Sequence, residues 1–355
     1  MSTLTTGERT LLGLVALATV LAGVGDYANF PTLLAFGLAT AALAGMAWVV
    51  SFATEQVGEQ FGPGLTGLLQ STLGNLPELF VVIFALRAGE TVVAQTSILG
   101  SIFANALLVL GLVIVVGARA SEDSCMRFKT RLPNDTATLL LVTSFIIVVV
   151  GLILGSHDPA AHHVKAISTI AAVSLLLVYV AWVVPYVRAD HAEHGGADRP
   201  AARLPLAVSG SLLAVAGVGA AFVSDWFINA LTPAIDQLGI SKAFAGLVIV
   251  AIAGNAVENT TGLVFAHKGQ SDLAISVVKN SVAQIAAFLF PALVLISLLF
   301  SHQLTFALAP VYIGALLLTS LVVWQVTGDG IASAFEGWAL IAIFVILGGV
   351  TLYQV

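Results

Sequence analysis

The chain has 355 residues, of which 59% are hydrophobic and only 9% are charged, and its formal net charge is -6. Soluble domains carry about 25% charged residues, so this composition excludes a soluble globular protein and indicates a polytopic membrane protein. The single cysteine, Cys125, excludes a disulfide framework and a thiolate metal site within one chain.

The apolar segments follow one another along the whole chain. A spanning helix needs roughly 20 mostly apolar residues, and the first segment lacks a signal-peptide cleavage site, so we interpret it as a retained helix. The expected fold class is an all-α polytopic membrane protein with about eleven transmembrane helices. The predicted spans are 10–25, 32–53, 64–86, 93–117, 136–155, 164–187, 204–226, 242–266, 272–298, 304–326 and 331–353.

Lysine and arginine are distributed unequally between the two sides of these spans. The side of the N-terminus has Arg9, Arg119, Arg127, Lys129, Arg131, Arg188, Arg199, Arg203 and Lys268. The opposite side has only Arg87, Lys165 and Lys242. The positive-inside rule therefore predicts a cytoplasmic N-terminus and a C-terminus outside.

A short motif with a carboxylate occurs twice inside the apolar segments. "GNLPEL" begins at residue 74 and "GNAVEN" begins at residue 254, so the glycine, asparagine and glutamate of the first copy recur with the same spacing in the second. Gly89 and Gly269 repeat at the same displacement along the chain, as do Ser101 and Ser281. Five predicted crossings separate the motif helices, so the second copy is expected to be inverted relative to the first. Inverted repeats of this kind are typical of secondary transporters.

The first copy of the motif offers several oxygen ligands. Pro77 has no N–H, which predicts a free carbonyl on Leu73, and Asn75 lies three residues before Glu78 on the same helix face. Ser71 and Thr72 extend this polar stripe. Carboxylate, amide and carbonyl oxygens, without histidine or cysteine, favour a hard cation such as calcium.

The second copy supplies an equivalent set, in Asn255 and Glu258. We therefore predict Glu78, Glu258, Asn75 and Asn255 as cation ligands. The border of the site is expected to include polar residues of the next helices, which need partners in an apolar sequence. These are Ser101, Asn105, Ser281 and Gln284. The structural alternative for all of these residues is hydrogen bonding between helices without a bound cation.

These residues resemble the cation/proton exchanger branch of the calcium/cation antiporter superfamily. Its members carry paired G-N-x-x-E motifs, each followed about twenty residues later by a polar helix, here "GSIFANALLVLG" and "NSVAQIAAFLFP". The resemblance also takes in "TEQVGEQFGPGLTGLLQSTLGN" and "DGIASAFEG", and it covers most of the chain after the first span.

The resemblance implies one extra N-terminal helix followed by two inverted five-helix repeats. The expected parts are an N-terminal region 1–31, a first repeat 32–187, a cytoplasmic linker 188–203 and a second repeat 204–355. It also implies that Glu78 and Glu258 bind calcium or a similar divalent cation and exchange it for protons by alternating access. Such a protein is not an enzyme, needs no cofactor and contacts membrane lipid but no nucleic acid. Whether it forms a homo-oligomer is left open.

The sequence departs from the family pattern near the second motif. Asn280 replaces the usual glycine, Asn259 replaces a histidine that often follows the glutamate, and Lys279 lies inside a predicted span. We expect Lys279 either to reach a motif glutamate, which would offset one negative charge, or to extend toward the cytoplasmic interface.

Three other functions are weighed against proton exchange. Sodium-coupled exchange is disfavoured because Ala251 and Ile252 stand where Ser71 and Thr72 occur in the first copy. A passive channel would require a pore loop, and an intramembrane hydrolase would require a catalytic motif; we find neither. The short loops favour a prokaryotic inner (plasma) membrane, with a vacuolar membrane as the alternative.

Overall fold

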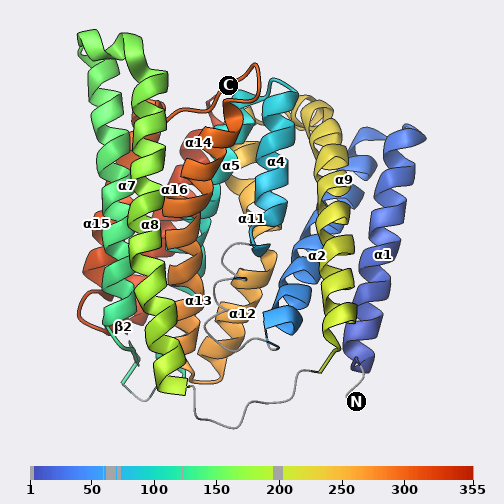
Figure 1. The fold of residues 1–355 in the computed structure, drawn as a ribbon, viewed down its shortest axis with the longest axis horizontal. Coiled ribbons are helices and arrows are strands. Elements are labelled where there is room, and N and C mark those ends of the chain that lie inside the picture. The colour runs from blue at the N-terminus through green and yellow to red at the C-terminus, as the bar shows by residue number, and fades with distance from the viewer. Residues whose placement is uncertain are drawn as a thin grey trace. The chain divides into compact units, whose positions relative to one another are not determined.

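The computed structural model describes residues 4–58, 60, 69, 73–121, 123–194 and 203–354, with the backbone alone for residues 186–194 and 258. Helices make up most of this part of the chain (Figure 1). Within it, nine helices are long and apolar enough to cross a membrane, and a tenth is counted when a bent pair is taken as one span. The polytopic helical fold is thus confirmed. Residues 64–68 and 70–72 of the predicted third span fall outside the described residues, so eleven helices stay a prediction.

The chain divides into two compact units, and each takes segments from both halves of the sequence. The first unit comprises Met1–Ala88 and Val180–Ile240, and the second comprises Gly89–Tyr179 and Ser241–Val355. The helix α8 (Val164–His194) contributes residues to both.

The first unit is held together by close packing of long helices. Its helices include α1 (Thr6–Tyr27), α2 (Thr32–Gly58), α4 (Leu76–Arg87) and α9 (Leu206–Leu238). A Cβ on Gly219 of α9 would lie 3.0 Å from the terminal methyl carbon of Met46 in α2, so the glycine permits this contact. Near the start of α1, Arg203 pairs with Glu8 at 2.9 Å, and the amide of Gln60 donates to the carbonyl of Leu204.

The second unit is built around two long interrupted helices. The first consists of α5 (Thr91–Phe103), the π-helical segment η1 (Ala104–Val109) and α6 (Leu110–Arg119). The other consists of α13 (Ser271–Gln284), the π segment η4 (Ile285–Leu289) and α14 (Phe290–Ser297). Both are more buried than the other candidate spans.

The remaining elements of the second unit surround these two helices. They are α7 (Arg131–Gly155), η2 (Pro159–His163), α10 (Lys242–Phe244), η3 (Ala245–Val250), α11 (Ala251–Gly254), α12 (Ala256–His267), α15 (Pro310–Thr327) and α16 (Ala334–Leu352). The all-α prediction missed a short antiparallel ladder between β1 (Cys125–Arg127) and β2 (Ile331–Ser333), in which Met126 faces Ala332. This ladder joins the segment after α6 to the segment before α16.

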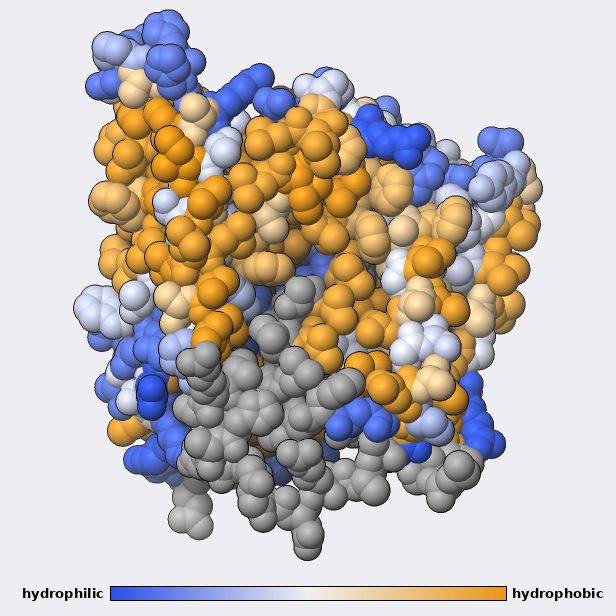
Figure 2. All heavy atoms as spheres, viewed as in Figure 1, coloured by the Kyte–Doolittle hydropathy of each residue, from blue (hydrophilic) through white to orange (hydrophobic). Residues whose placement is uncertain are grey.

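The surface is that of a membrane protein. Figure 2 shows hydrophobic side chains over the middle parts of the helices and hydrophilic ones gathered near their ends. Large apolar side chains project outward along single helices, as Leu14 and Leu17 do on α1 and Val215 and Val218 do on α9. Such a surface is stable only in contact with lipid or another apolar surface.

Candidate cation site

A helix begins inside each copy of the motif. The helix α4 begins at Leu76 directly after Asn75, and α12 begins at Ala256 directly after Asn255, so the two starts occupy equivalent positions of the repeat. In the second copy the segments before and after the break are bent by 57°. Val257 stands where the first copy has Pro77, so the break does not require the proline. At the start of a helix the missing N–H of Pro77 costs little. The predicted role of the Leu73 carbonyl stays a prediction.

The break places the motif carboxylate in the first turn of a helix. Glu78 belongs to the first turn of α4, and both it and Asn75 are buried. The free N–H groups and the dipole at a helix start favour a negative charge there. Glu258 takes the same position in the backbone of α12, although its side chain lies outside the described part, as do Ser71 and Thr72.

Four of the predicted residues form one buried hydrogen-bonded cluster in the second unit. The side-chain oxygen of Asn255 accepts from the amide of Asn105 at 2.7 Å. The amide of Asn255 donates to the hydroxyl of Ser101 at 2.9 Å, and also to the carbonyl of Ala251 at 2.9 Å. The amide of Asn105 donates in addition to the hydroxyl of Ser281 at 3.2 Å. Three helices are therefore joined at this point by neutral polar groups, and we call these four residues, Ser101, Asn105, Asn255 and Ser281, the asparagine cluster.

The asparagine cluster leaves one oxygen without a donor. Oδ1 of Asn105 is fully enclosed and accepts no hydrogen bond from the described residues. An enclosed oxygen without a donor is costly, and a hard cation or a water molecule would satisfy it. In the described part of the chain, no three histidine, cysteine or acidic side chains gather as a metal site. The described oxygens at the asparagine cluster are those of amide, hydroxyl and backbone carbonyl groups.

Each long central helix changes from α to π geometry beside these polar residues. Asn105 is the second residue of η1, and η4 begins directly after Gln284, which is half-buried. A further π segment, η3, precedes the second motif. Such segments are rare and are frequent at functional sites. Amphipathic periodicity in the sequence did not predict them, because a π segment changes the helical register without changing the composition.

Lys279 is buried, but its amine is directed to the end of another helix. Its side chain is 1% exposed, and Nζ donates to the hydroxyl of Thr327 at 3.3 Å. Two residues along a helix correspond to about 200° of rotation, so Lys279 and Ser281 of the asparagine cluster lie on opposite sides of α13. Thr327 is the last residue of α15, where the helix dipole favours a positive charge. The contact with Thr327 was not expected from the sequence.

The family described as sodium/calcium exchanger protein matches residues 31–186 and 208–352 of the chain. The chain is 32% identical over 313 residues to a vacuolar calcium ion transporter of Schizosaccharomyces pombe. The aligned region covers 85% of this chain and 75% of that protein. It is 27% identical over 339 residues to the Ca²⁺/H⁺ antiporter ChaA of Bacillus subtilis, covering 94% of this chain and 96% of that protein.

The fold is similar to that of a solved structure as well. The structure of native YfkE superimposes with a TM-score of 0.79 at 26% sequence identity, over 96% of this chain and 99% of the other. The similarity therefore extends over nearly the full length of both chains. It is not confined to the two motifs.

Proposed function

The chain belongs to the sodium/calcium exchanger protein family, in its cation/proton exchanger branch, and on this basis we propose that it exchanges calcium, or a similar divalent cation, for protons across a membrane. The observation that carries the proposal is that α4 and α12 are equivalent helices, one in each copy of the repeat. Two helices of equal length begin at equivalent positions of the repeat, each directly after an asparagine and each with a glutamate in its first turn. Relatives named as calcium transporters and Ca²⁺/H⁺ antiporters support the choice of ions.

In the proposed cycle the two glutamates bind either the cation or protons. Facing the cytoplasm, Glu78 and Glu258 are ionised and bind the cation together with Asn75 and Asn255. Facing the opposite side, protons displace the cation and return. The start of α4 stabilises the ionised form of Glu78 between these events. Because protonation removes the charge that holds the cation, the two substrates exclude one another, as coupled exchange requires.

The asparagine cluster acts as a neutral frame for the second half of the site. Its hydrogen bonds fix Asn255 at the start of α12, one turn before Glu258. Oδ1 of Asn105 is the oxygen of this frame that is available to a cation. Ser71, Thr72, the Leu73 carbonyl and Gln284 remain proposed members of the border, whereas Lys279 is left out of it because its amine donates to Thr327.

Protons are the proposed counter-ion in place of sodium. Ala251 and Ile252 bring no hydroxyl to the second motif, and the carbonyl of Ala251 already accepts from the amide of Asn255. Hydroxyl oxygens suited to a second type of metal ion are thus fewer in this copy. The family is one of transporters, which argues against the intramembrane hydrolase.

The protein is an integral membrane protein. For its topology we propose a cytoplasmic N-terminus, an outward C-terminus and the pair of inverted repeats 32–187 and 204–355 after the region 1–31. The matching positions of α4 and α12, together with the paired π segments η1 and η4, support the repeats. We propose a prokaryotic plasma membrane, although the relatives include both a vacuolar and a bacterial protein.

The proposal is tested with the purified chain in proteoliposomes that have an acidic interior. Calcium uptake and internal pH are followed together, with and without sodium, in the wild type and in Glu78→Gln and Glu258→Gln. Asp236→Asn is the matched control, because Asp236 is an exposed carboxylate near the end of α9.

The expected result is sodium-independent calcium uptake coupled to proton efflux, abolished by either glutamine variant and retained in the control. Calcium flux that ignores the pH gradient would instead indicate sodium coupling or a channel. An absence of calcium flux, with transport of another divalent cation, would correct the substrate but retain the exchange mechanism.

A further inference from the structure

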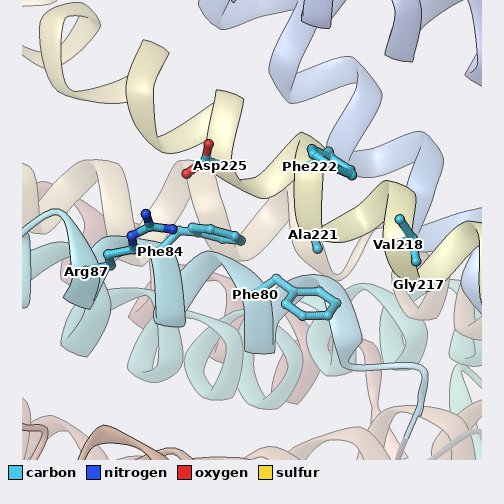
Figure 3. Close-up of a pocket in the computed structure, with 8 residues that line it drawn as sticks. All are labelled: Phe80, Phe84, Arg87, Gly217, Val218, Ala221, Phe222 and Asp225. Atoms are coloured by element: carbon cyan, nitrogen blue, oxygen red, sulfur yellow. The ribbon is translucent and has the colours of Figure 1, made fainter. Parts of the chain in front are cut away.

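The first unit has an open groove between α4 and α9 whose lining combines an apolar length with a charged end. Its volume is about 400 Å³, within the range of roughly 300–1,000 Å³ usual for ligand pockets. Figure 3 shows Phe80 and Phe84 of α4 along one wall, with Arg87 and Asp225 together at one end. The groove therefore has the polarity of a lipid molecule.

Each wall of the groove is formed by one face of one helix. Phe80, Phe84 and Arg87 follow one another at intervals of four and three residues, so they lie on a single face of α4. The wall from α9 includes Val218 and Phe222, which are 60% and 55% exposed. Large apolar side chains so exposed on a spanning helix face lipid. The groove is thus open to the hydrocarbon of the membrane.

The charged end of the groove lies at the membrane surface. Trp226, next to Asp225, makes an edge contact with Tyr27 at the end of α1, with ring centroids 6.4 Å apart. The amide of Asn229 donates to Asp26 at 3.4 Å, one turn further along α9. Tyrosine and tryptophan gather where a membrane meets water. These contacts place Asp225 at the level of the lipid headgroups.

The length of the groove corresponds to one leaflet. Gly217 is the lining residue of α9 most distant from Asp225, eight residues earlier, which is about 12 Å along the helix. Half of the hydrocarbon core of a membrane is about 15 Å thick. A single acyl chain that begins at the charged end therefore runs along most of the groove.

The two charges match a zwitterionic headgroup. Among the described residues, neither Arg87 nor Asp225 takes part in an ion pair, although both line the same end of the groove. A ligand with a phosphate and an ammonium group satisfies both. A purely anionic lipid would bring its charge beside the carboxylate of Asp225, and a choline headgroup has no N–H to donate.

We propose that the groove binds one phospholipid with a primary ammonium headgroup, of the phosphatidylethanolamine type, in the leaflet opposite the start of α1. Its phosphate contacts Arg87, its ammonium contacts Asp225 and one acyl chain packs against Phe80 and Phe84. The inference does not rest on the transported ion. Because α4 also carries Glu78, the lipid bridges α9 and the helix of a proposed cation ligand.

The test is native mass spectrometry of the full chain in detergent, after exchange with phosphatidylethanolamine, phosphatidylcholine or phosphatidylglycerol of the same acyl chains. We expect one retained phosphatidylethanolamine, and about tenfold weaker retention of the other two, the effect of one lost hydrogen bond to a charged group. Arg87→Gln and Asp225→Asn should each weaken retention of phosphatidylethanolamine to a similar extent. Ala221→Trp, which fills the groove, should remove it.

Matched controls separate the groove from the rest of the surface. Val215→Trp adds the same bulk to an exposed position of α9 outside the lining, and Asp236→Asn removes a carboxylate elsewhere on that helix. Both should retain phosphatidylethanolamine like the wild type. Equal retention of the three lipids by the wild type, or stronger retention of phosphatidylglycerol, would overturn the proposal even if a variant failed to fold. Unchanged retention in both charge variants would do the same.

Discussion

The two motif helices have the same backbone and different surroundings. The helix α4 spans Leu76–Arg87 and α12 spans Ala256–His267, and the turn after each contains a glycine with positive φ, +80° for Gly89 and +72° for Gly269. The first residue of the helix, its last residue and the glycine after it are all separated by the same number of residues in the two copies. The geometry that places a glutamate in the first turn of a helix is therefore independent of the side chains around it.

The residues after each glutamate differ in polarity. In α4 they are Leu79, Phe80 and Val81, whereas in α12 they are Asn259, Thr260 and Thr261. Oδ1 of Asn259 is enclosed and accepts no hydrogen bond from the described residues. The second copy thus carries polar groups beyond what its packing requires, and we expect water or the cation to approach along it.

The next helices differ in how closely another backbone approaches. Gly100 of α5 lies against η3, where an added Cβ would overlap the carbonyl of Leu247. The matching position in α13 is Asn280, which is half-buried and accommodates a full side chain. The same position is therefore a contact between backbones in one copy, whereas in the other it carries a half-buried side chain. The following predictions test this difference between the two copies.

Gly100→Ala is expected to have the largest effect. Its methyl group would meet backbone atoms that cannot rotate away, so we expect a loss of stability of about 3 kcal/mol or more. Asn280→Ala, the matched change, should cost less than about 1 kcal/mol. Thermal unfolding monitored by size-exclusion chromatography measures both. Similar losses in the two variants would contradict the difference between the copies.

Asn255→Ala is expected to have the second largest effect on stability. It leaves the hydroxyl of Ser101 without its donor, whereas the amide of Asn105 keeps the Ser101 carbonyl and the Ser281 hydroxyl as acceptors, so the loss is about 1–3 kcal/mol. Ser281→Ala removes a single acceptor and should cost about 1 kcal/mol. The same unfolding assay applies. An Asn255→Ala protein as stable as the wild type would show that the asparagine cluster adds nothing to packing.

Asn259→Leu makes the second copy like the first at the position of Leu79. Because it replaces an enclosed oxygen without a donor, we expect stability to change by less than about 1 kcal/mol. Calcium flux in proteoliposomes should nevertheless fall several-fold, through a higher KM. Unchanged flux would mean that the polar run of α12 is not on the cation's path. Asn259→Gln, which retains the amide, is the control.

Pro77→Ala is expected to have the smallest effect. In the second copy α12 begins with Val257 at the corresponding position, so α4 should begin at the same residue without the proline. A change below about 1 kcal/mol is expected from the added freedom of the unfolded chain. Transport by the variant, compared with the wild type at equal reconstituted amounts, should be preserved. A large loss would show that the proline itself shapes the first copy.

The repeated motif was the part of the site that the sequence revealed most directly. A glutamate three residues after an asparagine, present in both halves of the chain, predicted two equivalent copies of the site, but both were placed inside the spans 64–86 and 242–266, and a helix start at each was not predicted. The polar residues of the next helices predicted members of the asparagine cluster. Such predictions succeed because a polar side chain in an apolar segment must find a partner. The match to the exchanger family confirms the resemblance on which the function was based.

Other features depend on which side of a helix a residue faces in three dimensions. Lys279 differs from Ser281 by two positions, and only the three-dimensional structure shows that its amine donates to Thr327. The ladder of β1 and β2 pairs two segments of only three residues each that lie far apart in the chain, too short for a strand pattern in the sequence. The groove between α4 and α9 depends on aromatic residues that the sequence does not distinguish from ordinary lipid-facing ones.

Each compact unit is built from two segments that lie far apart in the sequence, so the helices that pack together in it are synthesised at different times. The helix α4 ends at Arg87, whereas its packing partner α9 begins only at Leu206. At a synthesis rate of about 5–20 residues per second, the start of α9 is synthesised roughly 6–24 s after the end of α4. During this interval the carboxylate of Glu78 has no completed unit around it. The early helices must therefore be held by the insertion machinery or by lipid until the second half of the chain arrives.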